Sequence, residues 1–355
     1  MDFSKASVYL VTDEKQRLYF TGFHSTAGHV ILTQDKTRFV VDSRYFYAAS
    51  KKLAKKGIEV FCGSDFSVLG SVLEQTGAKA LGVDFSLTTV KQLEGYKALG
   101  VELIDASSEY QKAMSVKTDE EIAYIQKACA IAEKSFKQVI SCVKEGISER
   151  ELATELEYRF KMNGASGCSF DTIVAFGANS AVPHHETGDK RLKAGMPVLM
   201  DFGCVYKGYC SDITRTFYFG TPTKQFVSAY NSVLAAHEVA YGNARAGMTG
   251  KEIDGLARQS LEADGLGKFF THSLGHGIGV NVHEAPWVSP KGDGKVENGM
   301  VFSIEPGVYL NGKFGIRIED SVLMCEGKPK TFMKTPKYLQ IVKNGKLKRY
   351  TGIGK

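Results

Sequence analysis

The chain carries one short pattern twice, as GMPVLMDFG at residues 195–203 and as GMVFSIEPG at residues 299–307. In each copy a Gly-Met pair opens an apolar run, and a carboxylate follows six residues after the first glycine. These carboxylates are Asp201 and Glu305. The apolar run is typical of a buried strand, and a carboxylate at its end cannot stay ionised in the interior without a compensating cation.

Each copy then leads into a glycine-containing turn and a returning strand with a second acid. The first copy turns through residues 206–208 and returns with Asp212, whereas the second turns through residues 311–313 and returns with Glu319. Both halves therefore read as β-hairpins that carry paired carboxylates. Four acids that converge in this way predict a bound metal, because cations must balance their charge.

Three histidines lie within twelve residues before the second copy, at His272, His276 and His283. The glycines between them let the backbone approach a ligand closely, and a neutral imidazole supplies the nitrogen donor of a mixed site. One histidine with four carboxylates fits a pair of divalent ions such as Mn²⁺, Co²⁺ or Zn²⁺. Two metals that share carboxylates are a hydrolase arrangement, which polarises a carbonyl and generates hydroxide at neutral pH.

These residues resemble the M24 metallopeptidases of the pita-bread fold, and within them the proline-specific branch of Xaa-Pro aminopeptidases and prolidases. The resemblance covers nearly the whole chain. In the catalytic half it rests on five motifs in order, namely Pro183-His184, DITRT at 212–216, GHGIG at 275–279, IEPG at 304–307 and RIED at 317–320. The segments YFTGF at 19–23 and DSRY at 42–45 resemble the N-terminal domain of this branch, which methionine aminopeptidases lack.

The resemblance implies two divalent metal ions per subunit, with Mn²⁺ as the first choice and Co²⁺ or Zn²⁺ as alternatives. By the family pattern, Asp201 chelates one ion, His276 and Glu305 chelate the other, and Asp212 and Glu319 bridge both. Glu305 is also the expected proton shuttle, because a metal-bound carboxylate lies within hydrogen-bond reach of the attacking water.

Two further histidines match the catalytic histidines of the family that bind no metal. His184 and His283 are expected to hold the scissile carbonyl and the amine side of the substrate. His185 follows directly, so a slip of one residue stays open.

Three residues are expected to bind substrate. His272 resembles the histidine that lines the pocket for the proline ring. Tyr309 and Arg317 match positions beside the metals, where a phenol contacts substrate and a guanidinium orients a bridging carboxylate. Arg317 is equally explained as an ordinary ion-pair partner of Asp320.

The expected activity is removal of the N-terminal residue from peptides with proline in second position, by an Xaa-Pro aminopeptidase. The alternative is prolidase, an Xaa-Pro dipeptidase, and the remote alternative is a non-peptidase pita-bread protein. A prolidase must bind the free carboxylate of its substrate, for which arginine is suited. No arginine lies between His283 and Glu305, and Trp287, either a packing anchor or a border of the proline pocket, stands in this loop; Lys291 or Lys295 are possible substitutes.

Composition and pattern predict two domains in an ordinary globular protein. The 355 residues are 43% hydrophobic and 24% charged, with a formal charge of +6 spread along the chain, which does not indicate nucleic-acid binding. Residues 1–112 alternate β-like and helical runs, an α/β pattern. Residues 113–355 open long helices with capping boxes, over about 118–140, 149–163 and 251–263, with a further helix over about 224–244.

The sequence argues against secretion, membrane insertion and disulfide bonding. The N-terminus lacks a signal-peptide pattern, and no apolar stretch is long enough to span a membrane, so we expect a cytoplasmic protein. The seven cysteines show no Cys-x-x-Cys pair and are expected to be reduced thiols, including Cys204 and Cys210 beside the first turn. The resemblance also implies a homodimer.

Overall fold

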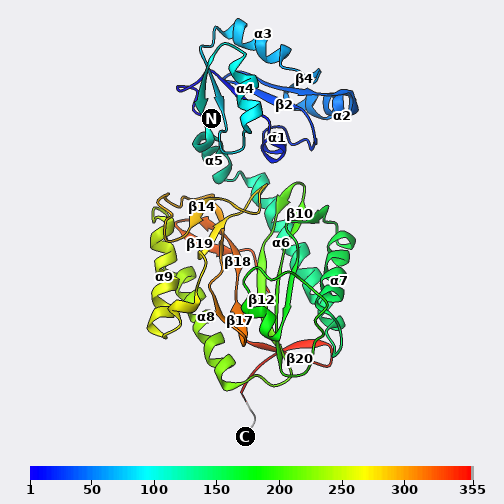
Figure 1. The fold of residues 1–355 in the computed structure, drawn as a ribbon, viewed down its shortest axis with the longest axis vertical. Coiled ribbons are helices and arrows are strands. Elements are labelled where there is room, and N and C mark those ends of the chain that lie inside the picture. The colour runs from blue at the N-terminus through cyan, green and yellow to red at the C-terminus, as the bar shows by residue number, and fades with distance from the viewer. Residues whose placement is uncertain (353–355) are drawn as a thin grey trace. The chain divides into compact units, whose positions relative to one another are not determined.

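The computed structural model describes residues 1–352, and the chain divides between Met114 and Ser115 into two compact units (Figure 1). The sequence pattern places this boundary slightly earlier, after residue 112. Each unit has its own sheets, helices and apolar core, which is the usual anatomy of separate domains.

The first unit is built on a mixed sheet of six strands in the order β4-β3-β2-β1-β5-β6. Side chains of β1 alternate between two apolar clusters, since Val8 and Leu10 pack with residues of α3 whereas Tyr9 and Val11 pack with residues of α2. The sheet is thus buried on both faces, and the predicted α/β architecture is confirmed. The strands are β1 (Val8–Val11), β2 (His29–Thr33), β3 (Thr37–Val41), β4 (Glu59–Cys62), β5 (Ala80–Val83) and β6 (Glu102–Asp105). The helices are α1 (Glu14–Thr21), α2 (Ser43–Leu53), α3 (Ser67–Thr76), α4 (Val90–Lys97) and α5 (Ser107–Ser115).

The second unit contains two five-stranded sheets, in the orders β21-β20-β12-β9-β8 and β14-β13-β15-β18-β19. The antiparallel pairs β9–β12 and β15–β18 lie at their centres, and each pair carries one copy of the repeated pattern. The strands of the first half are β7 (Gly167–Cys168), β8 (Ile173–Phe176), β9 (Met196–Phe202), β10 (Cys204–Tyr206), β11 (Tyr209–Cys210) and β12 (Ile213–Phe219). Those of the second half are β13 (Gly275–Gly277), β14 (Glu284–Val288), β15 (Val301–Ile304), β16 (Gly307–Leu310), β17 (Phe314–Arg317), β18 (Asp320–Cys325) and β19 (Lys328–Thr331).

Both predicted hairpins are interrupted beyond the acid. The tip of the first forms β10 and β11, which join β7 in a separate small sheet, and the tip of the second forms the two-stranded sheet β16–β17. Gly203 stands between β9 and β10, where a Cβ atom would lie 1.9 Å from the carbonyl oxygen of Ser211. Only glycine permits this approach, so the repeated glycine marks the bend of the hairpin.

Four long helices cover the sheets, and all of them were expected from the sequence. They are α6 (Asp119–Val139), α7 (Glu149–Met162), α8 (Lys224–Asn243) and α9 (Gly250–Ala263). The capping boxes at the starts of α6, α7 and α9 all form. Figure 1 shows α6 and α7 on one side of the strands and α8 and α9 on the other. A helix pair and a strand pair therefore occur twice, with the repeated carboxylates between the halves.

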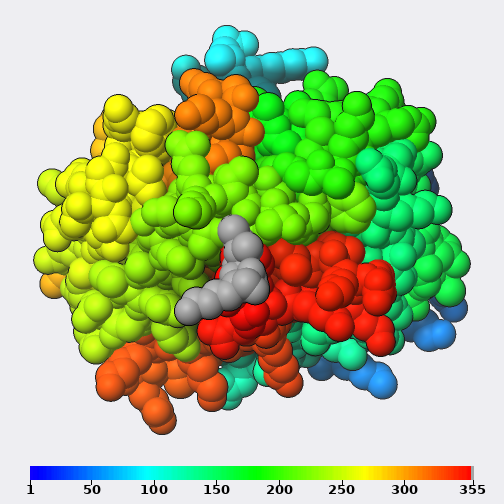
Figure 2. Space-filling model, turned by 90° about the horizontal axis from the view of Figure 1, so that it is seen from below, coloured from blue at the N-terminus to red at the C-terminus, as the bar shows by residue number. Residues whose placement is uncertain are grey.

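The C-terminal strands β20 (Gln340–Lys343) and β21 (Lys346–Arg349) form a hairpin, and β20 pairs in parallel with β12, with Ile341 opposite Tyr218. Figure 2 shows this C-terminal region in red on the surface of the second unit. Within residues 1–352, helices that combine the length and the apolar character needed to cross a membrane are absent.

Candidate metal centre and active site

The two central strand pairs bring the four repeated acids to one place. Asp201 lies near the end of β9 and opposite Thr214 of β12, and Asp212 immediately precedes β12. In the other half, Glu305 follows β15 and Glu319 precedes β18. Each acid pair therefore stands at the same end of an antiparallel pair, so the sheet register fixes all four side chains.

The structure brings all five predicted metal ligands together. Three overlapping groups have ligand atoms that lie within 4.8 Å of one another; they are Asp201-Asp212-Glu319, His276-Glu305-Glu319 and Asp212-His276-His283. The first two groups share Glu319, and Asp212 and His276 connect the third to the others. His283, which the sequence assigns to substrate, thus also lies within ligand distance of the cluster.

The chemistry of this cluster fits divalent cations. The Oδ1 atom of Asp201 and the Oε1 atom of Glu319 are buried and accept no hydrogen bond from the described residues. Burial, and after it the other carboxylates, raises the pKa values of Asp212 and Glu319 well above their usual range. Buried carboxylate oxygens that lack donors, in a cluster of four acids, need positive charge to stay ionised.

The backbone orients His276 toward the acids. Its Nδ1 lies 3.2 Å from the carbonyl oxygen of Gly277, and its Nε2 lies 3.2 Å from Oε1 of Glu305 and 3.6 Å from Oδ2 of Asp212. A hydrogen bond from Nδ1–H to this carbonyl leaves the Nε2 lone pair for a metal, as in many metal-binding histidines. In the metal-free protein, a protonated His276 instead donates from Nε2 to Glu305; burial raises the pKa of Glu305, but this hydrogen bond and nearby positive charge outweigh it and lower the pKa to about 2.

A chain of hydrogen bonds from Arg317 positions two of the acids. The hydroxyl of Thr214 donates to Oε2 of Glu319 at 2.7 Å, and Nε of Arg317 donates to the same hydroxyl at 3.0 Å. Arg317 also donates to Oδ2 of Asp201 at 2.6 Å, and its side chain is 4% exposed. Arg317 therefore contacts Asp201 directly and reaches Glu319, one of the expected bridging carboxylates, through the hydroxyl of Thr214.

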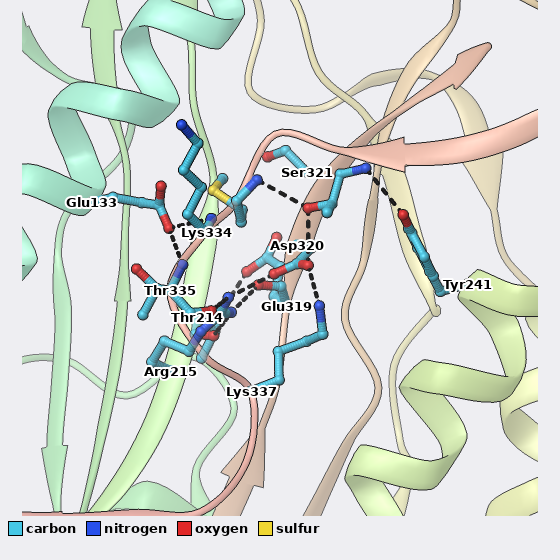
Figure 3. Close-up of polar contacts among 12 residues, drawn as sticks. Glu133, Thr214, Arg215, Tyr241, Glu319, Asp320, Ser321, Lys334, Thr335 and Lys337 are labelled. Atoms are coloured by element: carbon cyan, nitrogen blue, oxygen red, sulfur yellow. Dashed lines mark hydrogen bonds and ion pairs between the residues drawn. The ribbon is translucent and has the colours of Figure 1, made fainter. Parts of the chain in front are cut away.

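Asp320 has other partners than Arg317. Its carboxylate accepts hydrogen bonds from Arg215 at 2.7 Å and from Lys337 at 2.6 Å, in a buried network directly behind Glu319 (Figure 3). Arg215 also donates to the backbone oxygens of Glu319 and Thr214. The interpretation of Arg317 as a simple partner of Asp320 is thus wrong, because Arg215 and Lys337 reach that carboxylate from other strands and loops.

His272 and Tyr309 form a second chain that starts at Arg317. Nη1 of Arg317 donates to the Tyr309 hydroxyl at 2.6 Å, and this hydroxyl lies 2.9 Å from Nε2 of His272. Nδ1 of His272 lies 2.7 Å from the carbonyl oxygen of Ser273. Burial lowers the pKa of His272, so the ring is neutral and its tautomer follows, with Nδ1–H donating to Ser273 and Nε2 accepting from Tyr309.

The two adjacent histidines at 184 and 185 have different surroundings. His184 is exposed; burial lowers the pKa of both His272 and His283, and the nearby His184 lowers both a little further. Nε2 of His185 instead bonds to the fully buried carboxylate of Glu149 at 2.9 Å. The side chain that faces the cluster of site histidines is therefore His184.

His283 and Trp287 lie on the loop and strand that follow His276. The ring centroids of His283 and His276 are 4.2 Å apart. Trp287 in β14 is directly opposite His276 in β13, and opposite residues of an antiparallel pair project to the same face. Because Trp287 is 48% exposed, it is not a buried packing anchor.

Several supporting residues were not predicted from the sequence. Glu149 bonds to His185, Lys117 pairs with Glu284, and Thr214 contacts Glu319 directly. Thr214 and Glu149 had a weak local signal, since one lies beside Asp212 and the other in the first turn of a capped helix. The cysteine thiols contact carbonyl oxygens instead of the acids, Cys204 reaching Ala128 at 3.3 Å and Cys210 reaching Val280 at 3.6 Å.

Comparisons with known proteins agree with this architecture. The sequence profile of metallopeptidase family M24 matches residues 123–326, and that of the creatinase/prolidase N-terminal domain matches residues 1–114. An Xaa-Pro dipeptidase from Pyrococcus horikoshii is 36% identical over 341 residues, which cover 96% of each chain. Among solved structures, an Xaa-Pro dipeptidase from Bacillus anthracis is 36% identical, with a TM-score of 0.91 and 96% of both chains covered.

A second solved structure, an X-Pro aminopeptidase from Thermotoga maritima, is 34% identical, with a TM-score of 0.88, and covers 95% of this chain and 98% of that one. The fold is the one that the sequence resemblance implied, a creatinase/prolidase-type α/β domain followed by a pita-bread catalytic domain. The repeated carboxylate pattern, the clustered ligands and these similarities lead to one conclusion: the chain belongs to metallopeptidase family M24.

Proposed function

We propose that this protein is a dinuclear metal-dependent Xaa-Pro aminopeptidase, which releases the N-terminal residue from peptides with proline in second position. The observation that carries the proposal is the cluster of four acids and His276, in which Asp201 and Glu319 each keep a buried carboxylate oxygen without a donor. Mn²⁺ is the first candidate for both ions, with Co²⁺ or Zn²⁺ as alternatives, because an oxygen-rich set with one imidazole accepts all three.

The overlap of the ligand groups supports the assignment of the five ligands to two separate ions. Asp201 belongs to one group, Glu305 to another, and Glu319 to both, which is the placement of a bridging carboxylate. Asp212 likewise belongs to the group with Asp201 and to a group with His276. In the proposal, Asp201 would hold one ion, His276 and Glu305 would hold the other, and Asp212 and Glu319 would contribute to both.

When bound, such ions supply a Lewis acid that polarises the scissile carbonyl and lowers the pKa of the attacking water. Glu305 accepts the proton of that water and delivers it to the proline nitrogen as the C–N bond breaks. His184 and His283 donate hydrogen bonds to the carbonyl oxygen and to the amine side, where charge changes during the reaction. His283 also lies within ligand distance of Asp212 and His276, and in this proposal it contacts substrate and binds no metal.

The proline at the second position gives the substrate a tertiary amide without an N–H group. A site for this substrate needs an apolar wall for the ring and cannot rely on a hydrogen bond from that nitrogen. His272 and Tyr309 offer such a wall, because their polar atoms already bond to each other, to Arg317 and to the backbone. Arg317 has its contacts on protein atoms, so we assign it to positioning Asp201 and Tyr309.

Trp287 favours substrates longer than a dipeptide. Its exposed ring shares a face with His276, and this loop offers no arginine for a free carboxylate. The second candidate is Xaa-Pro dipeptidase, which is favoured by the names of the relatives from Pyrococcus horikoshii and Bacillus anthracis. The homodimer and the cytoplasmic location that the sequence predicts belong to the same proposal, and light scattering and cell fractionation test them.

Kinetics on matched peptides test the proposal. We expect kcat/KM for Xaa-Pro-Yaa tripeptides to equal or exceed that for the Xaa-Pro dipeptide, and Xaa-Ala-Yaa to resist cleavage. A strong preference for the dipeptide that disappears when its C-terminus is amidated would instead establish a dipeptidase. Equal cleavage of the alanine peptides would contradict proline specificity altogether.

A further inference from the structure

The two histidines assigned to substrate each precede a residue whose side chain is anchored in the interior. His184 is followed by His185, which bonds to Glu149, and His283 is followed by Glu284, which pairs with Lys117. Neither partner is near in sequence, since 36 residues separate the first pair and 167 the second. The same arrangement therefore occurs on two unrelated loops of the second unit.

Glu149 accepts hydrogen bonds from several residues of the loop that carries His184. Its side chain is 0% exposed and accepts hydrogen bonds from the backbone N–H of Phe176 at 2.8 Å and of Gly188 at 3.2 Å. It also accepts from the amide of Asn179 at 2.9 Å and from Nε2 of His185 at 2.9 Å. The carboxylate is satisfied by both ends of this loop, so it fixes the path of the chain through His184.

Glu284 anchors the loop that carries His283. Its Oε1 lies 2.6 Å from Nζ of Lys117, and the two side chains are 8% and 1% exposed. Its Oε2 accepts from the backbone N–H of Asn281 at 3.2 Å. A Cβ atom at Gly279 would lie 2.4 Å from Oε1 of Glu284, so the last glycine of GHGIG makes room for this carboxylate.

Lys117 is itself fixed by the backbone of the second unit. Its Nζ donates to the carbonyl oxygen of Ser115 at 3.0 Å, and its N–H donates to the carbonyl oxygen of Gly299 at 2.9 Å. Gly299 opens the second copy of the repeated pattern, which contains Glu305. The ion pair thus ties the His283 loop to the strand that leads to a candidate metal ligand.

We propose that Glu149–His185 and Lys117–Glu284 are two buried anchors that position His184 and His283 against the substrate. The predicted effect on turnover rests on the proposed function, whereas the positioning of the two loops by the anchors does not. The contacts described for the four anchor side chains within residues 1–352 include none to the five candidate metal ligands, so we class them as positioning residues. A displacement of about 1 Å in a catalytic group costs up to roughly 100-fold in rate.

A double-mutant cycle tests the second anchor. Lys117→Met should lower kcat by about 10- to 100-fold with little change in KM, because the histidine then misses only the transition state. The double variant Lys117→Met/His283→Ala should be no slower than His283→Ala alone, since the anchor acts through the histidine. Metal content by atomic emission should match the wild type. Rate losses that multiply, or loss of metal in Lys117→Met, would overturn the proposal.

Glu284→Gln is a second, isosteric variant in case Lys117→Met does not fold. Both variants should speed amide hydrogen exchange in residues 279–288 and leave the exchange of β12 unchanged. The equivalent cycle of His185→Ala with His184→Ala tests the first anchor. Arg150→Met, which removes the exposed ion pair with Asp189 (62% and 81% exposed), is the matched control and should retain wild-type kcat.

The exchange measurement separates the two proposals. A wild-type protein that cleaves no Xaa-Pro peptide would refute the proposed function, whereas local loosening of residues 279–288 would still support the anchor. Unchanged exchange in both Lys117→Met and Glu284→Gln would refute the anchor, whatever the activity.

Discussion

Replacing Asp212 by asparagine should have opposite effects on the metal-free and the metal-loaded protein. Asp212 is 4% exposed, and its ligand atom lies within 4.8 Å of those of Asp201 and Glu319. Burial, followed by the neighbouring carboxylates, raises its pKa well above the usual value. The metal-free protein therefore contains a repulsion that asparagine removes at nearly constant volume.

The size of the expected change in the free energy of unfolding follows from the distances between the carboxylates. Two unit charges 4.8 Å apart repel by about 3 kcal/mol at an effective dielectric constant of about 20. Proton uptake by the cluster relieves part of this repulsion, so the free energy of unfolding of the metal-free variant should rise by about 1–2 kcal/mol, or ~2–8 °C in Tm. With metal present, an affinity that falls about 10- to 100-fold should reduce the stabilisation by bound ions by roughly 1.4–2.7 kcal/mol.

Thermal unfolding in chelator and in excess Mn²⁺ provides the assay. The variant should melt above the wild type in chelator, gain less from Mn²⁺, and lose nearly all peptidase activity. Asp254→Asn is the matched control, because Asp254 is 1% exposed but pairs with Arg258 outside the ligand cluster. It should be destabilised in both conditions. An Asp212→Asn protein that melts below the wild type in chelator and gains the full Mn²⁺ shift would refute the reasoning.

Three further predictions follow from other parts of the structure. His184→Ala should keep its metal content and lose about 10²–10³-fold in kcat; a fully active His184→Ala beside a crippled His185→Ala would contradict the assignment. Arg317→Met should weaken Mn²⁺ binding in calorimetry by about 10- to 100-fold, because Asp201 loses its 2.6 Å contact, and unchanged affinity would refute that role. Burial lowers the pKa of His237 in the folded protein to about 3. As the pH falls below the ordinary pKa of histidine, only the unfolded state therefore gains a proton, and the free energy of unfolding decreases until the pH reaches about 3. In urea titrations His237→Leu should therefore lose about 2 kcal/mol less stability between pH 7 and pH 5 than the wild type, and equal losses would contradict this.

Local signals predicted most of the framework. The capping boxes at Thr118, Ser148 and Thr249 mark three helix starts correctly, because a cap depends on residues only three positions apart. The repeated pattern likewise located the strands and acids of the candidate site. Short elements with weak periodicity, such as α1 and α4, were not foreseen, since tertiary packing and not local preference stabilises helices of that length.

Contacts between distant segments could not be predicted from the sequence. Arg317 stands three residues from Asp320 but bonds to Asp201, because Arg215 and Lys337 already occupy Asp320 (Figure 3). The parallel pairing of β20 with β12 has no local signal either, since its partners are far apart along the chain. The two histidine anchors belong to the same class, in which the fold and not the spacing selects the partner.

The dependence of Xaa-Pro hydrolysis on added metal tests the central claim most directly. Protein stripped with chelator should be inactive toward an Xaa-Pro-Yaa tripeptide. Its activity should rise as Mn²⁺ is titrated in and level off at two equivalents per chain, as expected for a site that holds two ions between four carboxylates and His276. Full activity in the stripped protein, or no activity at any concentration of Mn²⁺, Co²⁺ or Zn²⁺, would contradict the account.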